Sequence, residues 1–417
     1  MKKLDQLIFL CLVLLILILP VAIAGVEVYA SLAAVLFLIK RVIALRRKEA
    51  FFAMIPDVIV VPALAFFSVC ALSVCFGEAP WLGLPALIGK MMQGIFLLFA
   101  VIEVVTTRRR FLILLGAFAL SAFVVSVDGL WQVNQGVDFL RGNALDSGRI
   151  LACMKHPNDL GVYLIFPLLM SMGLSLWTWF DRNKKDSVMG SRVGMAAVLL
   201  FGLSLVALGL TYSRGAWLGA FVAALVFVLM RRKYVWACMG FVLVFALFFS
   251  PRMTATRNVS FVSDTAKEST GLLVDGFSGS DRLLMWGDAS RIIKDHPVLG
   301  TGLNTYTRVI YRYSQYRKLY PHNGYLQITA ELGFIGLGVF LWLLASVGGF
   351  AWKRIVVGHE GMFVVLLSGL FAAWIGFLVQ SGLDTTLYSV QLSRLLWFVM
   401  GLLVAGSLVL VKESKSC

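Results

Sequence analysis

Apolar runs separated by short polar connections extend along almost the whole chain. Twelve of them approach or exceed the roughly 20 apolar residues that a membrane-spanning helix needs. This pattern predicts an all-α polytopic membrane protein of about twelve transmembrane helices, with residues 1–417 forming a single integral membrane domain. The predicted spans are 6–24, 26–43, 53–73, 86–106, 111–129, 159–180, 193–210, 215–230, 234–250, 325–350, 362–381 and 392–410.

The longest polar segment, 251–321, separates the ninth predicted span from the tenth. We expect it to form a large, partly helical periplasmic loop inserted between transmembrane helices 9 and 10. From Asp281 to Lys294 its apolar residues recur at helical spacing, which predicts a short amphipathic helix at the membrane interface. Those apolar residues are Leu284, Trp286, Ala289, Ile292 and Ile293.

Charge along the chain predicts the orientation of the spans. Only 14% of the residues are charged, against about 25% in soluble domains, which excludes a soluble protein. More than half of the Lys and Arg residues lie at the two termini and in the connection after every second span. Short basic connections mark the cytoplasmic side, so both termini are expected to be cytoplasmic.

The loop 251–321 is basic although it is expected to lie outside the cytoplasm. It carries ten Lys or Arg residues against six Asp or Glu residues. Long loops are exempt from the orientation rule, so this excess needs another reason. It indicates an anionic partner such as a phosphate or diphosphate. No nucleic-acid partner is expected, because the chain has no soluble basic domain.

His322 stands where the loop ends and the tenth span begins. Imidazole is the usual general base near neutral pH, and a histidine at the mouth of a membrane helix favours a catalytic role. Asn323, Gln327 and Glu331 follow at intervals of four residues and therefore share one helix face. That face either lines a cleft running inward from His322 or forms hydrogen bonds between helices.

Arginines and a second histidine occupy the other outward connections. Arg214 lies in a very short turn, where Gly215 would let backbones approach; the alternative is an arginine that reaches lipid phosphates. Arg141 and Arg149 are candidates for phosphate contacts. His156 either caps the sixth span or contacts substrate, and His296, next to Pro297, is expected to be a turn residue.

Several reaction types are disfavoured by missing motifs. The chain has no Asp-x-Asp, no phosphate-binding Walker loop, no G-x-S-x-G and no His-rich metal motif. We therefore expect no metal and no cofactor. In a metal-free phosphate site, arginines would neutralise the phosphate charge.

Four local sequences resemble those of the bacterial O-antigen ligase family, as does the overall topology. The Ser-Arg-Gly-Ala and Pro-His-Asn-x-x-Leu-Gln elements are the more specific parts. The superfamily also includes O-antigen polymerases and protein O-oligosaccharyltransferases. The four sequences are GRILACMKHPNDLGVYL (148–164), TYSRGAWLG (211–219), DRLLMWGDASRIIKDHPVLGTGLNTY (281–306) and PHNGYLQITAELGFIGLG (321–338).

The resemblance implies a metal-independent membrane glycosyltransferase of the bacterial inner membrane, active on the periplasmic side. Its donor would be polysaccharide linked to undecaprenyl diphosphate, and its acceptor a sugar hydroxyl of the lipid A–core oligosaccharide. His322, Arg214 and Arg282 match the family's functional positions. His322 would be the general base of an inverting displacement, and the arginines would bind the diphosphate. Substrate contacts are expected from Arg141, Arg149, His156, Asn323 and Gln327.

Two other hypotheses about the function also fit the sequence. A polymerase would use similar residues but extend another glycan chain. A lipid or glycan transporter would need ionisable pairs within the membrane and repeat symmetry. The residues that could serve in such pairs are dispersed along the chain: Asp57, Lys90, Glu103, Glu331 and Asp384.

Overall fold

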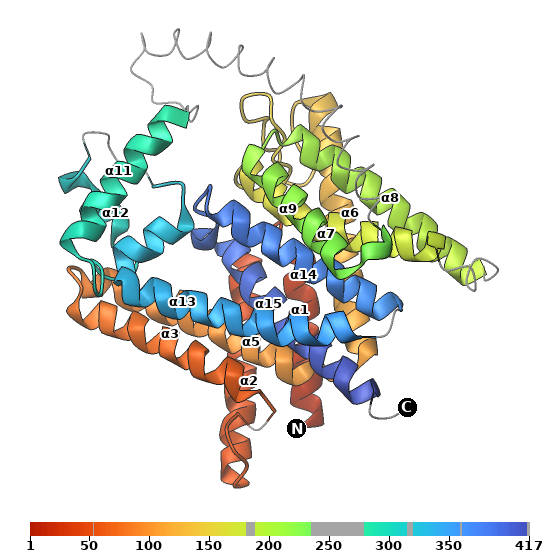
Figure 1. The fold of residues 1–417 in the computed structure, drawn as a ribbon, viewed down its shortest axis with the longest axis horizontal. Helices are drawn as coiled ribbons and strands as arrows, with labels where there is room; N and C mark the ends of the chain where they lie inside the picture. Colours follow the sequence, from red (N-terminus) through yellow and green to blue (C-terminus); the bar gives the residue numbers. More distant parts are fainter. Residues whose placement is uncertain (53, 181–187, 235–278, 315–319, 359–360, 415–417) are drawn as a thin grey trace.

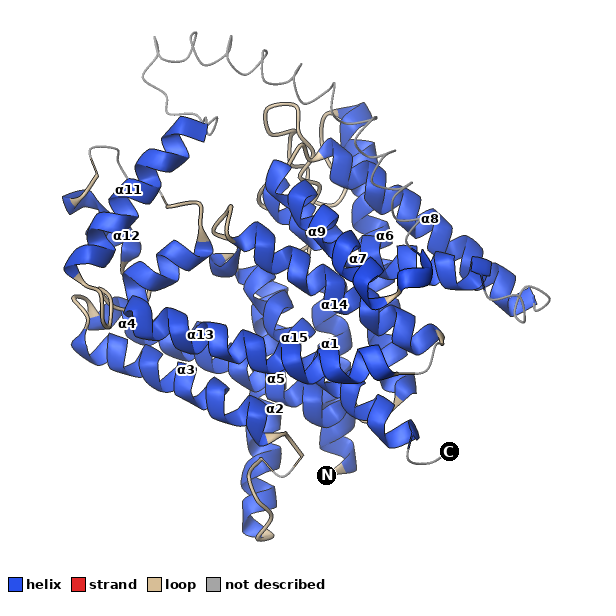
Figure 2. Ribbon diagram, in the orientation of Figure 1, coloured by secondary structure: helices blue, strands red, loops and turns tan. Residues whose placement is uncertain are grey.

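Helices make up the regular structure of this chain. The computed structural model describes residues 1–52, 54–180, 188–234, 279–314, 320–358 and 361–414. Within these ranges no β-strand forms, and the only β-pairing is the isolated bridges Val137–Ala144 and Asp146–Arg149. Figure 2 shows the helical architecture, which confirms that the fold is all-α.

The helices follow the predicted apolar runs closely, with short helices at several connections. Their bounds are α1 Lys2–Ile18, α2 Ile23–Arg46, α3 Asp57–Phe76, α4 Pro80–Ala86, the π-helical η1 Leu87–Met92, α5 Gln93–Val104, α6 Arg108–Gln135, α7 Pro157–Phe180, α8 Val188–Leu210, α9 Arg214–Met230, η3 Arg232–Tyr234, α11 Gly279–Asp295, α12 Tyr306–Val309, η4 Ile310–Arg312, α13 Gly324–Val357, α14 Met362–Ser381, η5 Thr386–Tyr388 and α15 Val390–Ser414.

Nine helical segments in the described ranges are long and apolar enough to cross a membrane, and α4, η1 and α5 count together as one of them. This establishes a multi-pass membrane protein. The helices α1 and α9 are shorter, at 17 residues each. The predicted span 234–250 lies almost wholly outside the described residues, so the count of twelve stays a prediction.

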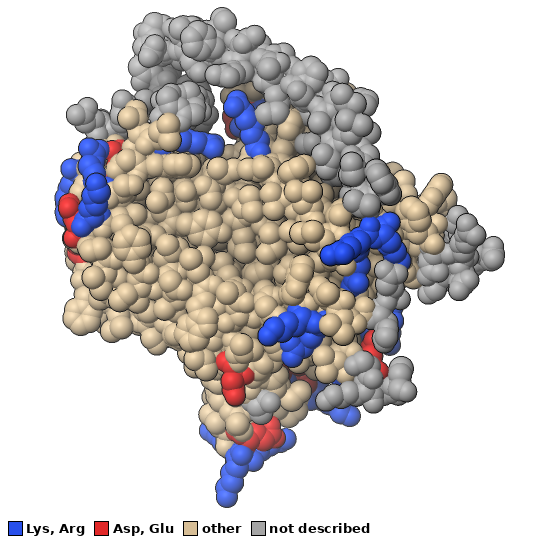
Figure 3. Space-filling view, in the orientation of Figure 1, with Lys and Arg blue, Asp and Glu red and all other residues tan. Residues whose placement is uncertain are grey.

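The helices pack in pairs that bring distant parts of the chain together. α14 packs against both α7 and α9, α13 runs along α3, and α5 runs along α15. Figure 1 shows α7, α8 and α9 together on the right, α3, α11 and α13 on the left, and α14 and α15 between them. The surface in Figure 3 has a broad area without charged side chains, as expected of a surface that faces lipid.

The helix α13 is broken at Gly333, where the sequence had predicted one continuous span. Gly333 has φ 69° and ψ −175°, which is not helical. The segment 297–302 fills the break: Thr301 N donates to Ala330 O at 2.9 Å, and Phe334 N donates to Pro297 O at 2.8 Å. The break therefore separates a short outer helix, 324–332, from the rest of α13.

The predicted amphipathic helix of the loop is present as α11. Its apolar residues Ala289, Ile292 and Ile293 are buried in a small cluster with residues of α12, η4 and Ala330 of α13. Leu284, which was assigned to the same face, is 51% exposed. The apolar face of α11 thus packs partly on protein. The part of the loop at 251–278 lies outside the described residues.

Candidate functional site

His322 is fixed at the start of α13 by the residues that follow it. The Asn323 side chain caps the helix, since its Oδ1 accepts hydrogen bonds from Tyr325 N at 3.0 Å and Leu326 N at 3.1 Å. His322 itself has a positive φ of 44°, an unfavourable conformation for a residue with a Cβ. Two residues further on, Gly324 N donates to Asp384 O at 3.1 Å and ties this turn to the connection between α14 and α15.

The His322 imidazole contacts a carboxylate from that same connection. Its Nδ1 lies 3.0 Å from Asp384 Oδ1, and the two side chains are 28% and 12% exposed. Asp384 also accepts hydrogen bonds from Asn158 Nδ2 at 2.6 Å and from Thr385 N at 2.8 Å. Burial alone would raise the pKa of Asp384, but the hydrogen bond and charge of His322 and the other two donors lower it below its ordinary value of 3.8. Asp384 is therefore ionised near neutral pH.

An ionised Asp384 selects one tautomer of His322. A carboxylate only accepts hydrogen bonds, so Nδ1 carries the proton that points at Asp384. In the neutral ring Nε2 is then the acceptor nitrogen, which is the arrangement of a general base oriented by a carboxylate. The geometry thus prepares His322 to take a proton through Nε2.

Arg149 extends this hydrogen-bonded chain toward α7 and α9. Its Nη2 donates to Asn158 Oδ1 at 2.8 Å, and its Nε donates to Thr211 O at 2.8 Å. Burial lowers the pKa of Arg149, and the charges of Arg282 and Arg214 lower it further, while Asp146 and Asp384 raise it. Arg282, Arg214 and Asp384 therefore each lie close enough to Arg149 to act on its charge.

Arg282 and Arg214 approach the same connection from different helices. Arg282, near the start of α11, donates from Nη1 to Leu383 O at 3.1 Å, one residue before Asp384. Arg214 is the first residue of α9, after the capping residue Ser213, and its side chain is exposed. Within the described part of the chain, Arg149, Arg214 and Arg282 form no ion pair with a carboxylate. These arginines can therefore bind an anion without breaking an existing ion pair.

The sequence predicted that helix backbones approach each other closely at Gly215, but the close approach occurs one turn later, at Gly219. A Cβ on Gly215 would make only ordinary contacts, the nearest at 3.4 Å from Gln380 Cγ. A Cβ on Gly219 would lie 2.6 Å from Gly376 O. Gly219 and Gly376 are therefore the positions where α9 and α14 meet backbone to backbone.

The other candidate side chains lie farther from this chain of contacts. Arg141 is exposed and its Nη1 reaches Cys153 O at 3.4 Å. His156 is exposed just before α7, and its carbonyl oxygen accepts a hydrogen bond from Leu160 N at 3.2 Å. Gln327 is 1% exposed, and its Nε2 donates to Glu331 Oε1 at 3.3 Å. No described contact joins these three residues to His322.

Sequence reasoning missed Asp384 and Asn158 as members of the site. Asp384 is 62 residues from His322 and Asn158 is 226 residues from Asp384. Asn158 did stand in one of the four sequences that resemble the ligase family. Asp384 had only one signal, namely that it is a carboxylate in an outward connection.

Residues 198–341 match the family described as O-Antigen ligase. The finding confirms the resemblance seen in the sequence. Over 162 residues the chain is 30% identical to a protein of Rickettsia bellii (strain RML369-C) named "Putative polysaccharide ligase". That alignment covers 36% of this chain and 38% of the relative, so it spans well under half of either protein.

The matched segment contains Arg214, Arg282 and His322, which are the three residues predicted to be catalytic. Arg149, Asn158 and Asp384 lie outside it. Contacts in the folded chain join His322 and Arg282 to the connection that holds Asp384, and Asn158 joins Asp384 to Arg149.

Proposed function

We propose that this protein is an O-antigen ligase acting on the periplasmic face of the inner membrane. It would transfer polysaccharide from undecaprenyl diphosphate to a sugar hydroxyl of lipid A–core and so complete lipopolysaccharide. One observation carries the proposal: a carboxylate-oriented histidine stands beside several arginines within and around an O-antigen ligase family segment.

The reaction would be a direct displacement. His322 Nε2 accepts the proton of the acceptor hydroxyl as its oxygen attacks the anomeric carbon of the donor. The bond from that carbon to the diphosphate oxygen breaks, and the lipid diphosphate leaves with the bonding electrons. Arg214 and Arg282, assisted by Arg149, stabilise the charge on the leaving group. A single displacement inverts the anomeric centre, so retention in the product linkage, read by NMR, would refute this step.

Substrate contacts of Arg141, His156, Asn323 and Gln327 remain part of the proposal. Arg141 and His156 are exposed and available to a large glycan. Asn323 and Gln327 face inward and bond to protein groups, so their contribution would be to hold the start of α13. Metal independence and an outward orientation of the site are part of the same proposal.

The test is transfer by purified full-length protein in the presence of EDTA. The donor is polysaccharide on lipid diphosphate, and the acceptor is lipopolysaccharide that lacks O-antigen. His322→Ala is expected to lower the rate by about 10²-fold or more, since general bases contribute 10²–10⁴-fold. His296→Ala is the matched control, because His296 bonds to Glu78 in the loop region and not to Asp384.

Each other outcome assigns a different function. If wild-type protein only lengthens the lipid-linked donor, the protein is a polymerase. If neither reaction occurs although lipid-linked glycan crosses the membrane, it is a transporter. Equal transfer rates for wild type and His322→Ala would remove His322 from the mechanism.

A further inference from the structure

A largely apolar pocket lies on the other side of the turn that holds Asp384. It is walled by α3, η1, α13 and α15 and has a volume of about 50 Å³. Leu387 and Tyr388 line it, and Leu387 also packs against Gly324, where a Cβ would lie 2.9 Å from Leu387 Cδ1. The turn 384–388 therefore separates this pocket from His322.

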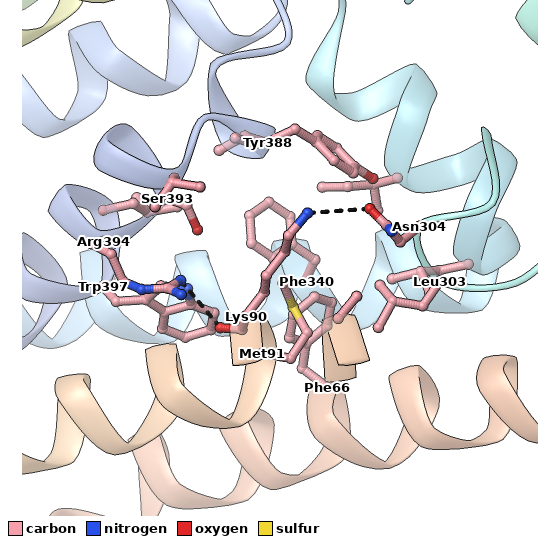
Figure 4. Close-up of a pocket in the computed structure, with 16 residues that line it drawn as sticks. Phe66, Lys90, Met91, Leu303, Asn304, Phe340, Tyr388, Ser393, Arg394 and Trp397 are labelled. Carbon is pink, nitrogen blue, oxygen red and sulfur yellow. Dashed lines mark hydrogen bonds between the residues drawn. The ribbon is translucent and has the colours of Figure 1, made fainter. Parts of the chain in front are cut away.

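One cationic side chain extends into the pocket. Lys90 lies in the π-helical segment Leu87–Met92, a rare geometry often found at functional positions. Figure 4 shows its side chain crossing the pocket toward Asn304, and Lys90 Nζ donates to Asn304 Oδ1 at 3.2 Å. An ammonium group has three donors. The described residues supply Lys90 with this one acceptor and with no carboxylate at ion-pair distance.

The other charges around the pocket already have partners. Arg394 is bound by Glu27 at 3.0 Å and by Gly89 O at 2.7 Å. Glu331 lies behind Asn304, and its carboxylate accepts hydrogen bonds from Asn304 N, Tyr306 N, Gln327 Nε2 and Tyr388 Oη. Lys90 thus has donors left for a ligand and a charge that no described carboxylate pairs with, in a pocket whose walls are largely apolar.

The surroundings of Lys90 suit an anion that is attached to hydrocarbon. Phe66, Phe340 and Trp397 form apolar walls, and Ser393 adds a hydroxyl to the same lining. Next to the pocket, Leu84 and Ile88 are 52% and 51% exposed, so the apolar surface continues outward along the same helical segment.

We infer that this pocket binds the phosphate end of an anionic lipid, with the phosphate at Lys90, Asn304 and Ser393 and the first carbons of the chain against Phe66, Phe340 and Trp397. The site is separate from the arginines assigned to the diphosphate. It does not depend on the proposed glycosyl transfer.

Lipid binding is measured on purified full-length protein by native mass spectrometry, which counts bound lipids. Phosphatidic acid is titrated against wild type, Lys90→Met, Lys90→Arg and Lys155→Met. Lys155 is an exposed lysine outside the pocket, and its variant is the matched control. Loss of a charged hydrogen bond predicts about tenfold or greater weakening of one lipid site in Lys90→Met. Lys90→Arg and Lys155→Met should retain it.

Arg282→Met tests whether the Lys90 pocket and the arginines assigned to the diphosphate are two distinct anion sites. It is expected to weaken a different lipid site, so that the double variant Lys90→Met/Arg282→Met loses both. If Lys90→Met does not yield folded protein, Ser393→Leu is used to test the inference in its place. This variant keeps the ammonium group and fills the space beside it. Ser393→Leu should then weaken the same site about tenfold.

Three results would overturn the inference. The first is unchanged phosphatidic acid affinity in Lys90→Met or, in its place, in Ser393→Leu. The second is equally tight binding of phosphatidylcholine to the Lys90 site. The third is inorganic phosphate occupying the site as tightly as the lipid, because the apolar walls would then play no part.

Discussion

At the scale of single residues, Asp384 and His322 form the contact on which the proposed chemistry depends. In Asp384→Asn the partner of Nδ1 is neutral and its amide can present either oxygen or nitrogen, so the Nε2-acceptor tautomer of His322 is no longer enforced. We expect kcat of glycan transfer to fall by about 10²-fold, with KM for both substrates changed little. Steady-state kinetics of the purified variant measure this.

Asp57→Asn is the control for that variant, because Asp57 is exposed in the first turn of α3. It should transfer glycan at the wild-type rate. A merely structural role for Asp384 would appear as unfolding or as parallel loss of kcat and lipid binding. Normal kcat in folded Asp384→Asn would contradict the positioning role.

The lowered pKa of Asp384 predicts how its stabilising effect varies with pH. A carboxyl whose pKa is lower in the folded state contributes stability above its unfolded value, near 3.9, and loses it as the pH falls through the folded value. The difference in Tm between wild type and Asp384→Asn should therefore persist from pH 7 to about pH 5 and shrink below about pH 4. A difference that already disappears by pH 5 would show that Asp384 is not held ionised.

The sequence could predict the chemistry of single residues better than their partners. His322 is recognisable because a histidine at the start of an apolar run follows a long polar loop. Its contact with Asp384 depends on how the connection after α14 folds back over the start of α13, and no local spacing encodes that. Arg149 could be nominated as a cation, but its link to Asp384 through Asn158 exists only in the folded chain.

At the scale of elements, the break in α13 requires a glycine at position 333. A Cβ at Gly333 would lie 2.0 Å from Val298 O, and the residue has a φ of 69°. Gly333→Ala should destabilise the protein by about 3 kcal/mol or more, since backbone strain and a steric clash add together. Thermal unfolding of the detergent-purified variant measures this loss.

Gly338→Ala is the matched control in the same helix. A Cβ at Gly338 would meet nothing within 4 Å, so the substitution should change stability by no more than about 1 kcal/mol. Equal Tm values for the two variants would mean that segment 297–302 can pack against α13 without the break at Gly333. Because the break positions the helix that begins beside His322, Gly333→Ala should also slow glycan transfer.

Apolar runs predict where helices lie but not where they are interrupted. The first predicted span, 6–24, continues past Pro20, whereas α1 ends at Ile18 and α2 already begins at Ile23. Proline cannot continue the hydrogen bonding of a helix, so the end of α1 could have been predicted from Pro20. Gly333 gave a weaker signal, because a glycine in a membrane helix is common and only the approach of Val298 requires its positive φ.

At the scale of the whole molecule, ionised groups gather at the two ends of the bundle. At one end Glu103 pairs with Lys40 and Arg41, and Lys40 also pairs with Asp5. At the other end are Asp384, His322 and the arginines. Figure 1 shows the N-terminus and the end of α15 at the lower end and α11 and α12 at the upper end. The site is thus on the side of the bundle opposite the N-terminus.

Single cysteines in a variant with all six native cysteines replaced by serine would fix that orientation. Arg312→Cys lies in the loop before His322, where the Arg312 side chain is 59% exposed, and Arg47→Cys lies at the exposed end of α2 near the termini. Basic short connections face the cytoplasm, so a membrane-impermeant maleimide should label Arg312→Cys in intact spheroplasts and Arg47→Cys only after permeabilisation. The reverse pattern would put His322 and its arginines in the cytoplasm, where a periplasmic acceptor could not reach them, and would refute the ligase proposal as a whole.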